Sequence, residues 1–82
     1  MRVISKTIHY SEYDLFVKLT PDGYIHYSVN SGPLLPYSAR IVETAYGYYV
    51  CSADDFDTVY HCGSKNSCYF FVVDCIREML SL

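Results

Sequence analysis

The residues best suited to chemistry lie in the C-terminal third of the chain, where one histidine and three cysteines occur close together. His61 and Cys62 are adjacent, and Cys68 and Cys75 follow after five and six intervening residues. A structural zinc site needs two close ligand pairs, such as two CxxC-type pairs. No such pair occurs here, and on a helix Cys68 and Cys75 would lie about two turns apart. The spacing therefore predicts reduced thiols that pack as small apolar side chains, with no metal and no cofactor bound.

A cysteine nucleophile is the second chemistry that these residue types allow. The thiol would need a base within hydrogen-bonding reach and a third group that orients this base. The chain has three histidines and four cysteines, but no nucleophile elbow or family-type cysteine motif surrounds any of them. The stretch GSKN, residues 63–66, also lacks the spacing of a phosphate-binding loop and is expected to be a turn. A small cysteine-dependent enzyme is therefore kept only as an alternative to a protein without catalytic activity.

Length and composition limit the kind of protein. The 82 residues predict a single domain, residues 1–82, and a hydrophobic content of 51% excludes a disordered chain. A net charge of −3 argues against binding to phosphate backbones through a basic face. We see no secretory signal and no apolar run of membrane-spanning length, so we expect a cytoplasmic protein without membrane contact. Ten tyrosines are more than a small core can bury, so several should be exposed.

The clearest structural element that could position these side chains is a β-hairpin over residues 14–29. Pro21, Asp22 and Gly23 match a three-residue loop in which the glycine takes a left-handed conformation. This loop sets a register in which the apolar residues of both strands share one face. That face comprises Leu15, Val17, Leu19, Ile25, Tyr27 and Val29, and the other carries Phe16, Lys18, Tyr24, His26 and Ser28. Turn chemistry and apolar pattern thus agree on one arrangement.

The segments on either side of this hairpin have weaker patterns. Residues 3–10 alternate enough to predict a preceding strand. Residues 30–37 are punctuated by glycine and two prolines and are expected to form a loop. Leu34 and Leu35 within that loop should be buried under the sheet, because bare apolar side chains in a loop are unfavourable.

Residues 40–53 predict a second hairpin that turns at Gly47. Neither loop length that we considered separates its two faces, so its register is left open. Residues 53–62 have two interpretations. A short helix is favoured, because a serine and an aspartate three residues later resemble a capping box and apolar residues follow at helical spacing. An edge strand over residues 57–62 is the alternative.

Residues 67–82 are the best candidate for a long helix. Phe70 and Phe71 fall on its polar side, outside an apolar stripe, and whether they are exposed is left open. The stripe consists of Tyr69, Val72, Val73, Ile76, Met79 and Leu80. A strand over residues 67–73 is the competing interpretation. The elements predict an α+β fold, in which an antiparallel sheet of four or five strands packs against the C-terminal helix, with one short additional helix over residues 53–62.

These features favour a small non-enzymatic protein-binding module that acts as a stoichiometric blocker or adaptor. Tyr and Phe suit the centre of an interface because they offer a large area with few rotatable bonds, and carboxylates suit its rim. Small inhibitors encoded by phages and other mobile elements, including anti-CRISPR proteins, are similar in character, so we expect an inhibitor of a host macromolecular machine. The expected partner-binding residues are Tyr24, Tyr46, Tyr48, Asp54, Asp55, Asp57 and Phe70.

Binding of nucleic acid is the first alternative. Exposed aromatic side chains on a sheet can stack on bases, and Phe16, Tyr24 and Tyr48 could form such a platform. Platforms of this kind are normally framed by Lys and Arg, whereas only Lys18 is expected nearby, so this function ranks second. A homodimer held together by the surplus aromatic residues is a further arrangement that the sequence allows.

Overall fold

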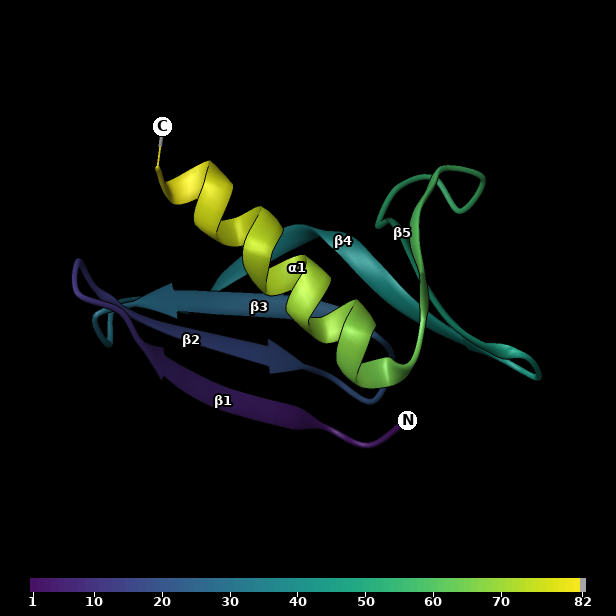
Figure 1. The fold of residues 1–82 in the computed structure, drawn as a ribbon, viewed down its shortest axis with the longest axis horizontal. Helices are drawn as coiled ribbons and strands as arrows, with labels where there is room; N and C mark the ends of the chain where they lie inside the picture. The colour runs from purple at the N-terminus through teal and green to yellow at the C-terminus, as the bar shows by residue number, and fades with distance from the viewer. Residues whose placement is uncertain (82) are drawn as a thin grey trace.

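The computed structural model describes residues 1–81 and has the α+β architecture expected from the sequence (Figure 1). Within these residues, one antiparallel sheet of six strands packs against one C-terminal helix. The elements are β1 (Ile4–His9), β2 (Asp14–Leu19), β3 (Tyr24–Val29), β4 (Leu35–Thr44), β5 (Gly47–Ser52), β6 (Val59–Gly63) and α1 (Lys65–Leu80). Each strand pairs with the next one along the chain, so the sheet is a simple meander. In residues 1–81, no helix is both long and apolar enough to cross a membrane.

The β2–β3 hairpin has the predicted turn and register. Val17 lies opposite Tyr27, and Leu19 lies opposite Ile25. Gly23 has a φ of +88°, and its N–H donates to the carbonyl of Thr20 at 2.9 Å. A side chain at Gly23 would also overlap the Ile41 carbonyl. The position therefore requires glycine for two reasons, the left-handed conformation and the close approach of β4.

The core lies between α1 and the face of the sheet that α1 crosses. β2 contributes three residues without solvent exposure, and α1 contributes the largest buried side chain, Tyr69. Tyr27 and Val29, predicted on the same face, are half-buried and pack against the core. The buried cluster comprises Leu15, Val17, Leu19, Ile25, Ala39, Ile41, Val50, Cys68, Tyr69, Val72, Val73 and Ile76.

α1 begins slightly earlier than predicted. Ser64 is the N-cap, and its hydroxyl accepts the backbone N–H of Ser67. The expectation of a turn over residues 63–66 is therefore wrong, because Ser64 can cap a helix that starts at Lys65. Of the predicted apolar stripe, Met79 is 38% exposed rather than buried. The last residue of the predicted helix, Leu82, lies outside the described residues.

The favoured short helix over residues 53–62 is wrong, and the alternative strand is correct. Residues 59–63 form β6, which raises the strand number above the expected four or five. The carboxylate of Asp55 accepts hydrogen bonds from the Asp57 N–H at 2.9 Å and from the Thr58 hydroxyl at 2.7 Å. These bonds lower the pKa of Asp55. The polar residues that resemble a helix cap therefore close a local turn instead.

The expected loop over residues 30–37 is too long, because β4 already begins at Leu35. Leu34 and Leu35 are 49% and 43% exposed, so the prediction that they are buried is wrong. Leu35 lies opposite Tyr27 in the ladder between β3 and β4. Pro36 is tolerated in this strand because β5 reaches only as far as Ala39, so one side of Pro36 has no neighbouring strand.

The register of the second hairpin, which the sequence leaves open, follows from a two-residue turn. Thr44 pairs with Gly47, which has a φ of +136°. Ile41 then lies opposite Val50, and both side chains are buried. The hairpin itself is confirmed, including the turn at Gly47, and it extends away from the helix in Figure 1.

We predict that Val17→Ala lowers the free energy of unfolding by about 1–3 kcal/mol, because it removes fully buried methyl groups and leaves a cavity. The matched control is Lys18→Ala, one position along β2 and on the opposite face, which should change stability by less than about 0.5 kcal/mol. Denaturant unfolding of both variants measures the difference. Equal losses would contradict the assigned faces.

A second prediction concerns Tyr69, whose hydroxyl donates to the Val17 carbonyl at 2.7 Å. Burial raises the pKa of Tyr69 from its ordinary 10.0 to about 12. The phenol therefore stays protonated in the folded protein at pH values where the unfolded chain ionises. The stability that it contributes is complete below pH 10 and is lost as the pH rises toward 12.

Urea unfolding over this alkaline range should show a smaller loss of stability in Tyr69→Phe than in the parent protein. Tyr46→Phe is the control, because Tyr46 is fully exposed and its removal should leave the pH dependence unchanged. A Tyr69→Phe variant that loses stability as steeply as the parent would show that Tyr69 is not the responsible group.

Candidate functional site

The C-terminal half of α1 and strands β4 and β6 form a groove that is open to solvent. α1 begins next to the end of β6 and crosses the sheet diagonally, so the helix diverges from β6 toward its C-terminus (Figure 1). The groove has a wide section of about 800 Å³ and a narrow section of about 150 Å³, and Tyr37 and Cys75 line both sections. We call this feature the α1–β4 groove; its lining includes Tyr37, Ala39, Val50, Tyr60, Phe71, Cys75 and Met79.

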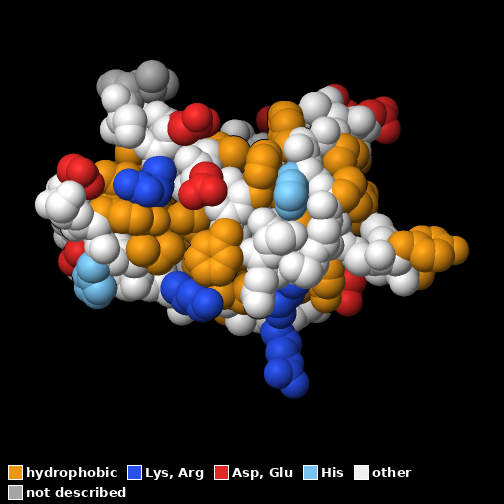
Figure 2. All heavy atoms as spheres, viewed as in Figure 1, with side chains coloured by type: hydrophobic (Ala, Val, Ile, Leu, Met, Phe, Trp, Pro, Cys, Tyr) orange, Lys and Arg blue, Asp and Glu red, His pale blue; other side chains and the backbone are white. Residues whose placement is uncertain are grey.

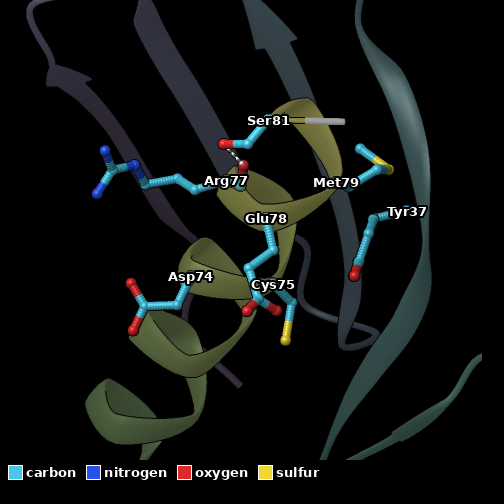
Figure 3. A pocket seen from close by; sticks show the side chains of 7 residues that line it. All are labelled: Tyr37, Asp74, Cys75, Arg77, Glu78, Met79 and Ser81. Carbon is cyan, nitrogen blue, oxygen red and sulfur yellow. Dashed lines mark hydrogen bonds between the residues drawn. The ribbon is translucent and has the colours of Figure 1, made fainter.

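One wall of the groove is a row of side chains along α1. Phe71, Cys75 and Met79 follow one another at four-residue intervals, a spacing that places side chains in line on one side of a helix. Phe71 is half-buried and stacks on the ring of His61, with 4.8 Å between the centroids. Figure 3 shows Cys75 and Met79 on the side of α1 that faces Tyr37. The row is thus covered at its N-terminal end and open at its C-terminal end.

The opposite wall is aromatic and comes from β4 and β6. The ring of Tyr37 meets Tyr27 edge-on, with 6.3 Å between the centroids. Burial, followed by the nearby Cys75, raises the pKa of Tyr37, so this ring is neutral at physiological pH. Tyr60 of β6 is 53% exposed. The wall therefore offers aromatic area together with phenolic hydroxyl groups that can form hydrogen bonds.

The rim of the groove carries two carboxylates and one guanidinium, so its net charge is negative. Asp74 and Glu78 line its wide section, and both side chains are exposed. Arg77 also borders this section, but Figure 3 shows its side chain directed away from Tyr37. The guanidinium carbon of Arg77 lies 3.7 Å from the ring centroid of Tyr10. In Figure 2, acidic side chains lie beside α1 and over the loop between β5 and β6, whereas Lys and Arg lie to the left of and below them.

The thiol in the groove is poorly suited to act as a nucleophile. Burial, with smaller contributions from the carboxylates of Glu78 and Asp74, raises the pKa of Cys75. Burial also raises the pKa of Cys51 and Cys68. The thiolate is the reactive form of cysteine, so these three side chains remain neutral thiols at physiological pH. Cys75 contributes a small polarisable surface to the groove wall.

His61 connects β6 to the start of α1. Its Nε2 atom lies 3.4 Å from the Ser67 hydroxyl oxygen, and this hydroxyl donates to the Ser64 carbonyl at 3.0 Å. Its ring stacks on Phe71. Across residues 1–81, no three His, Cys, Asp or Glu side chains gather closely enough to hold a metal ion. His61 thus contacts the first two turns of α1 through Ser67 and Phe71.

The seven residues expected to bind a partner do not form one surface. Tyr24 lies on the outer face of the sheet, opposite α1, and is paired with Arg40. The Arg40 guanidinium carbon lies 4.8 Å from the ring centroid of Tyr24 and 5.1 Å from that of Phe56. The three expected aspartates are exposed in the loop of residues 53–58, which also carries Phe56. These four residues thus belong to the outer face and its border.

The three remaining residues lie elsewhere. Tyr46 is fully exposed at the tip of the β4–β5 hairpin. Tyr48 lies on the α1 side of the sheet, packs against the core and donates its hydroxyl to Glu43 at 3.2 Å. Phe70 is 44% exposed, outside the core stripe as predicted, and its ring centroid lies 5.3 Å from the Lys6 amine on the β1 side of α1.

The sequence alone does not single out the groove residues. Tyr37 falls in the segment expected to be a loop, and Tyr60 falls in the segment expected to be a helix, so neither is placed beside α1. The signal that could find one wall is the four-residue spacing of Phe71, Cys75 and Met79. This row runs next to the core stripe and becomes visible as a separate surface only once the strands that α1 covers are known.

We predict that the four cysteines react unequally with a maleimide at neutral pH. Cys62 is exposed and should react first, while the three thiols with raised pKa should react much more slowly. Denatured, non-reduced protein should show all four free thiols, and Cys62→Ser should lose the fast phase. A native Cys75 that reacts as fast as Cys62 would instead indicate an activated thiol in the groove.

We compared the chain with protein-family models, with curated proteins and with solved structures. None of the three comparisons finds a match. The interpretation of the groove therefore depends on its own geometry and chemistry.

Proposed function

We propose that this chain is a protein-binding module that acts without catalysis, as a stoichiometric blocker or adaptor, and that the α1–β4 groove holds its partner. The observation that carries the proposal is the open hollow of about 800 Å³ between α1 and β4. Its walls carry exposed Met79 and half-buried Tyr37. Protein interfaces are built around apolar and aromatic anchors inside a polar rim, and Asp74 and Glu78 can supply that rim.

The apolar surface extends beyond the groove along the start of β4. Leu35 is 43% exposed and lies two residues before Tyr37. Alternate residues of a strand point to the same face, so Leu35 and Tyr37 share the side of the sheet on which α1 lies. Large exposed apolar side chains next to a hollow are typical of surfaces that a partner covers. Leu35 therefore enlarges the proposed contact surface.

The ionisable groups of the groove also support binding over catalysis. Cys75 and Tyr37 have raised pKa values and are neutral at physiological pH. A general base or a nucleophile needs a pKa tuned toward the working pH, usually with a partner that orients it. The pKa values of Cys75 and Tyr37 are instead shifted upward, away from the working pH. The alternative of a small cysteine-dependent enzyme therefore gains no support from these residues.

The nucleic-acid alternative depends on the outer face of the sheet. Phe16 and Tyr24 lie on that face, together with Lys18 of β2, which is paired with His26, and Arg40 of β4, which is paired with Tyr24. Tyr48, the third aromatic residue of the expected platform, lies on the α1 side instead. The acidic loop of residues 53–58 borders the outer face, and its charge would repel phosphates. We therefore place a protein partner first.

The narrower expectation of an inhibitor encoded by a phage or another mobile element, anti-CRISPR-like in character, stays a prediction. The same applies to a cytoplasmic location and to a homodimer. A groove with aromatic walls suits a blocker and an adaptor equally, because both functions require a stable contact and no reaction. The identity of the partner would separate them.

We predict that the double variant Tyr60→Ala with Met79→Ala weakens binding of the native partner by at least about thirtyfold. Loss of an aromatic or apolar anchor costs about 2 kcal/mol or more, and each 1.4 kcal/mol corresponds to about tenfold in affinity. Both side chains are more than a third exposed, so the melting temperature should remain nearly unchanged. The partner is captured from host lysate with immobilised parent protein and identified by mass spectrometry, and its affinity for each variant is then measured.

Tyr46→Ala is the matched control, because Tyr46 is a fully exposed tyrosine at the hairpin tip. It should bind the partner like the parent protein. Loss of binding in Tyr46→Ala with retention in the groove variant would refute the groove and favour the surface expected from the sequence. A captured partner that is nucleic acid, with affinity falling steeply as salt rises, would refute a protein partner.

A further inference from the structure

We infer that the occupant of the α1–β4 groove is an amphipathic helix of the partner, with basic residues along the edges of its apolar stripe, which packs alongside α1. This inference rests on the proposed function, because it assumes that the groove binds a protein. It goes further by naming the secondary structure and the charge of the bound segment. Three features of the groove support it, namely the row on α1, the shape of β6 and the charge of the rim.

The row on α1 has the geometry that a second helix would contact. Helices pack by placing the ridge of one, formed by residues four apart, into a groove of the other. Phe71, Cys75 and Met79 form such a ridge over about two helical turns. The ridge is separate from the buried stripe that includes Val72 and Ile76. α1 therefore packs its buried stripe against the sheet and leaves the C-terminal part of the ridge available for contact with a partner.

The alternative of an added strand is disfavoured by the structure of β6. β6 is the edge strand next to the groove, and an extended peptide could pair with its free backbone groups or with the short free edge at the start of β4, where Pro36 has no N–H to offer. The β5–β6 register shifts, since Val50 pairs with His61 but Cys51 pairs with Val59. Tyr60 is the extra residue of this bulge. Bulges interrupt the regular edge that strand addition needs, so a helix suits the groove better.

The charge of the rim selects among amphipathic helices. Asp74 and Glu78 are four residues apart on α1, both are exposed and both line the wide section. Figure 3 shows Glu78 next to Cys75 and Asp74 farther from Tyr37. The Arg77 guanidinium lies over Tyr10, and Figure 3 shows it directed away from Tyr37, whereas the Glu78 carboxylate lies near Cys75. Opposite charges at the rim of an interface speed association and discriminate between partners. Lys or Arg at the edges of the incoming stripe would meet these two carboxylates.

Three synthetic peptides of about 18 residues, or roughly five helical turns, test the inference. The first has apolar residues at positions i, i+3, i+4 and i+7 of each repeat, flanked by Lys and Arg. The second keeps the same apolar stripe with Asp and Glu as flanks. The third has the composition of the first in scrambled order. Binding to the full chain is measured by fluorescence anisotropy at two salt concentrations, and the site is located by NMR shift changes.

The basic amphipathic peptide should bind at least about tenfold more tightly than the other two and should weaken as salt rises. Its shift changes should centre on Tyr37, Cys75 and Met79. The double variant Asp74→Lys with Glu78→Lys should reverse the preference in favour of the acidic peptide. The control is Asp22→Lys with Asp54→Lys, which makes the same charge change at exposed loop residues that do not line the groove and should leave the preference intact.

Equal binding of the basic and acidic peptides, or equal binding of the scrambled peptide, would overturn the inference. Shift changes confined to the outer edge of β6 would replace the helix by an added strand. Concentration-dependent self-association in ultracentrifugation that disappears in Met79→Lys would replace it by a second copy of this chain. These failures are distinct from failure of the proposed function, in which the captured partner binds the double variant Tyr60→Ala with Met79→Ala as tightly as the parent protein.

Discussion

The diagonal path of α1 across the sheet is the constraint on which the rest of the structure depends. In residues 1–81 one helix of 16 residues must cover the apolar face of a six-stranded meander. The hydrogen bond from the Tyr69 hydroxyl to the Val17 carbonyl joins the helix to β2, and the short connection through Ser64 holds its N-terminus beside β6. The core continues along α1 through Val72 and Val73 to Ile76. Toward its C-terminus the helix diverges from β6, and the α1–β4 groove follows from that divergence (Figure 1).

The same constraint explains the two unlike sides of α1. On one side Arg77 lies over Tyr10 and Lys6 lies near Phe70, so two long basic side chains contact aromatic rings on the β1 side of the helix. On the other side Cys75 and Met79 face Tyr37 without such a cover (Figure 3). Lys6 thus lies on the β1 side of α1, while Arg77 borders the groove together with Asp74 and Glu78 but places its guanidinium over Tyr10. The contact between Arg77 and Tyr10 thus directs this guanidinium away from Tyr37 (Figure 3).

Local chemistry decided which elements of this arrangement the sequence could predict. The β2–β3 hairpin was predictable because the Pro21–Gly23 turn and the apolar alternation independently specify one register. The loop of residues 53–58 was not predictable, because the Asp55 side chain can cap a helix or close a turn. Only the pairing of β6 with β5 decides between these two structures. The position of Phe70 outside the apolar stripe followed from helical periodicity, whereas its exposure of 44% did not, because it depends on what packs beside α1. The groove depends on which strands α1 leaves uncovered, which is a tertiary property.

The central claim is that a partner covers the α1–β4 groove, and hydrogen–deuterium exchange of the chain with and without its captured partner tests it most directly. Buried contact slows the exchange of backbone amides in the covered segments. Binding should slow exchange in residues 71–79, 35–39 and 59–61, and leave the hairpin tip at residues 44–47 unchanged. Protection confined to the hairpin tip or to the acidic loop of residues 53–58, with residues 71–79 exchanging as in the free protein, would contradict the claim.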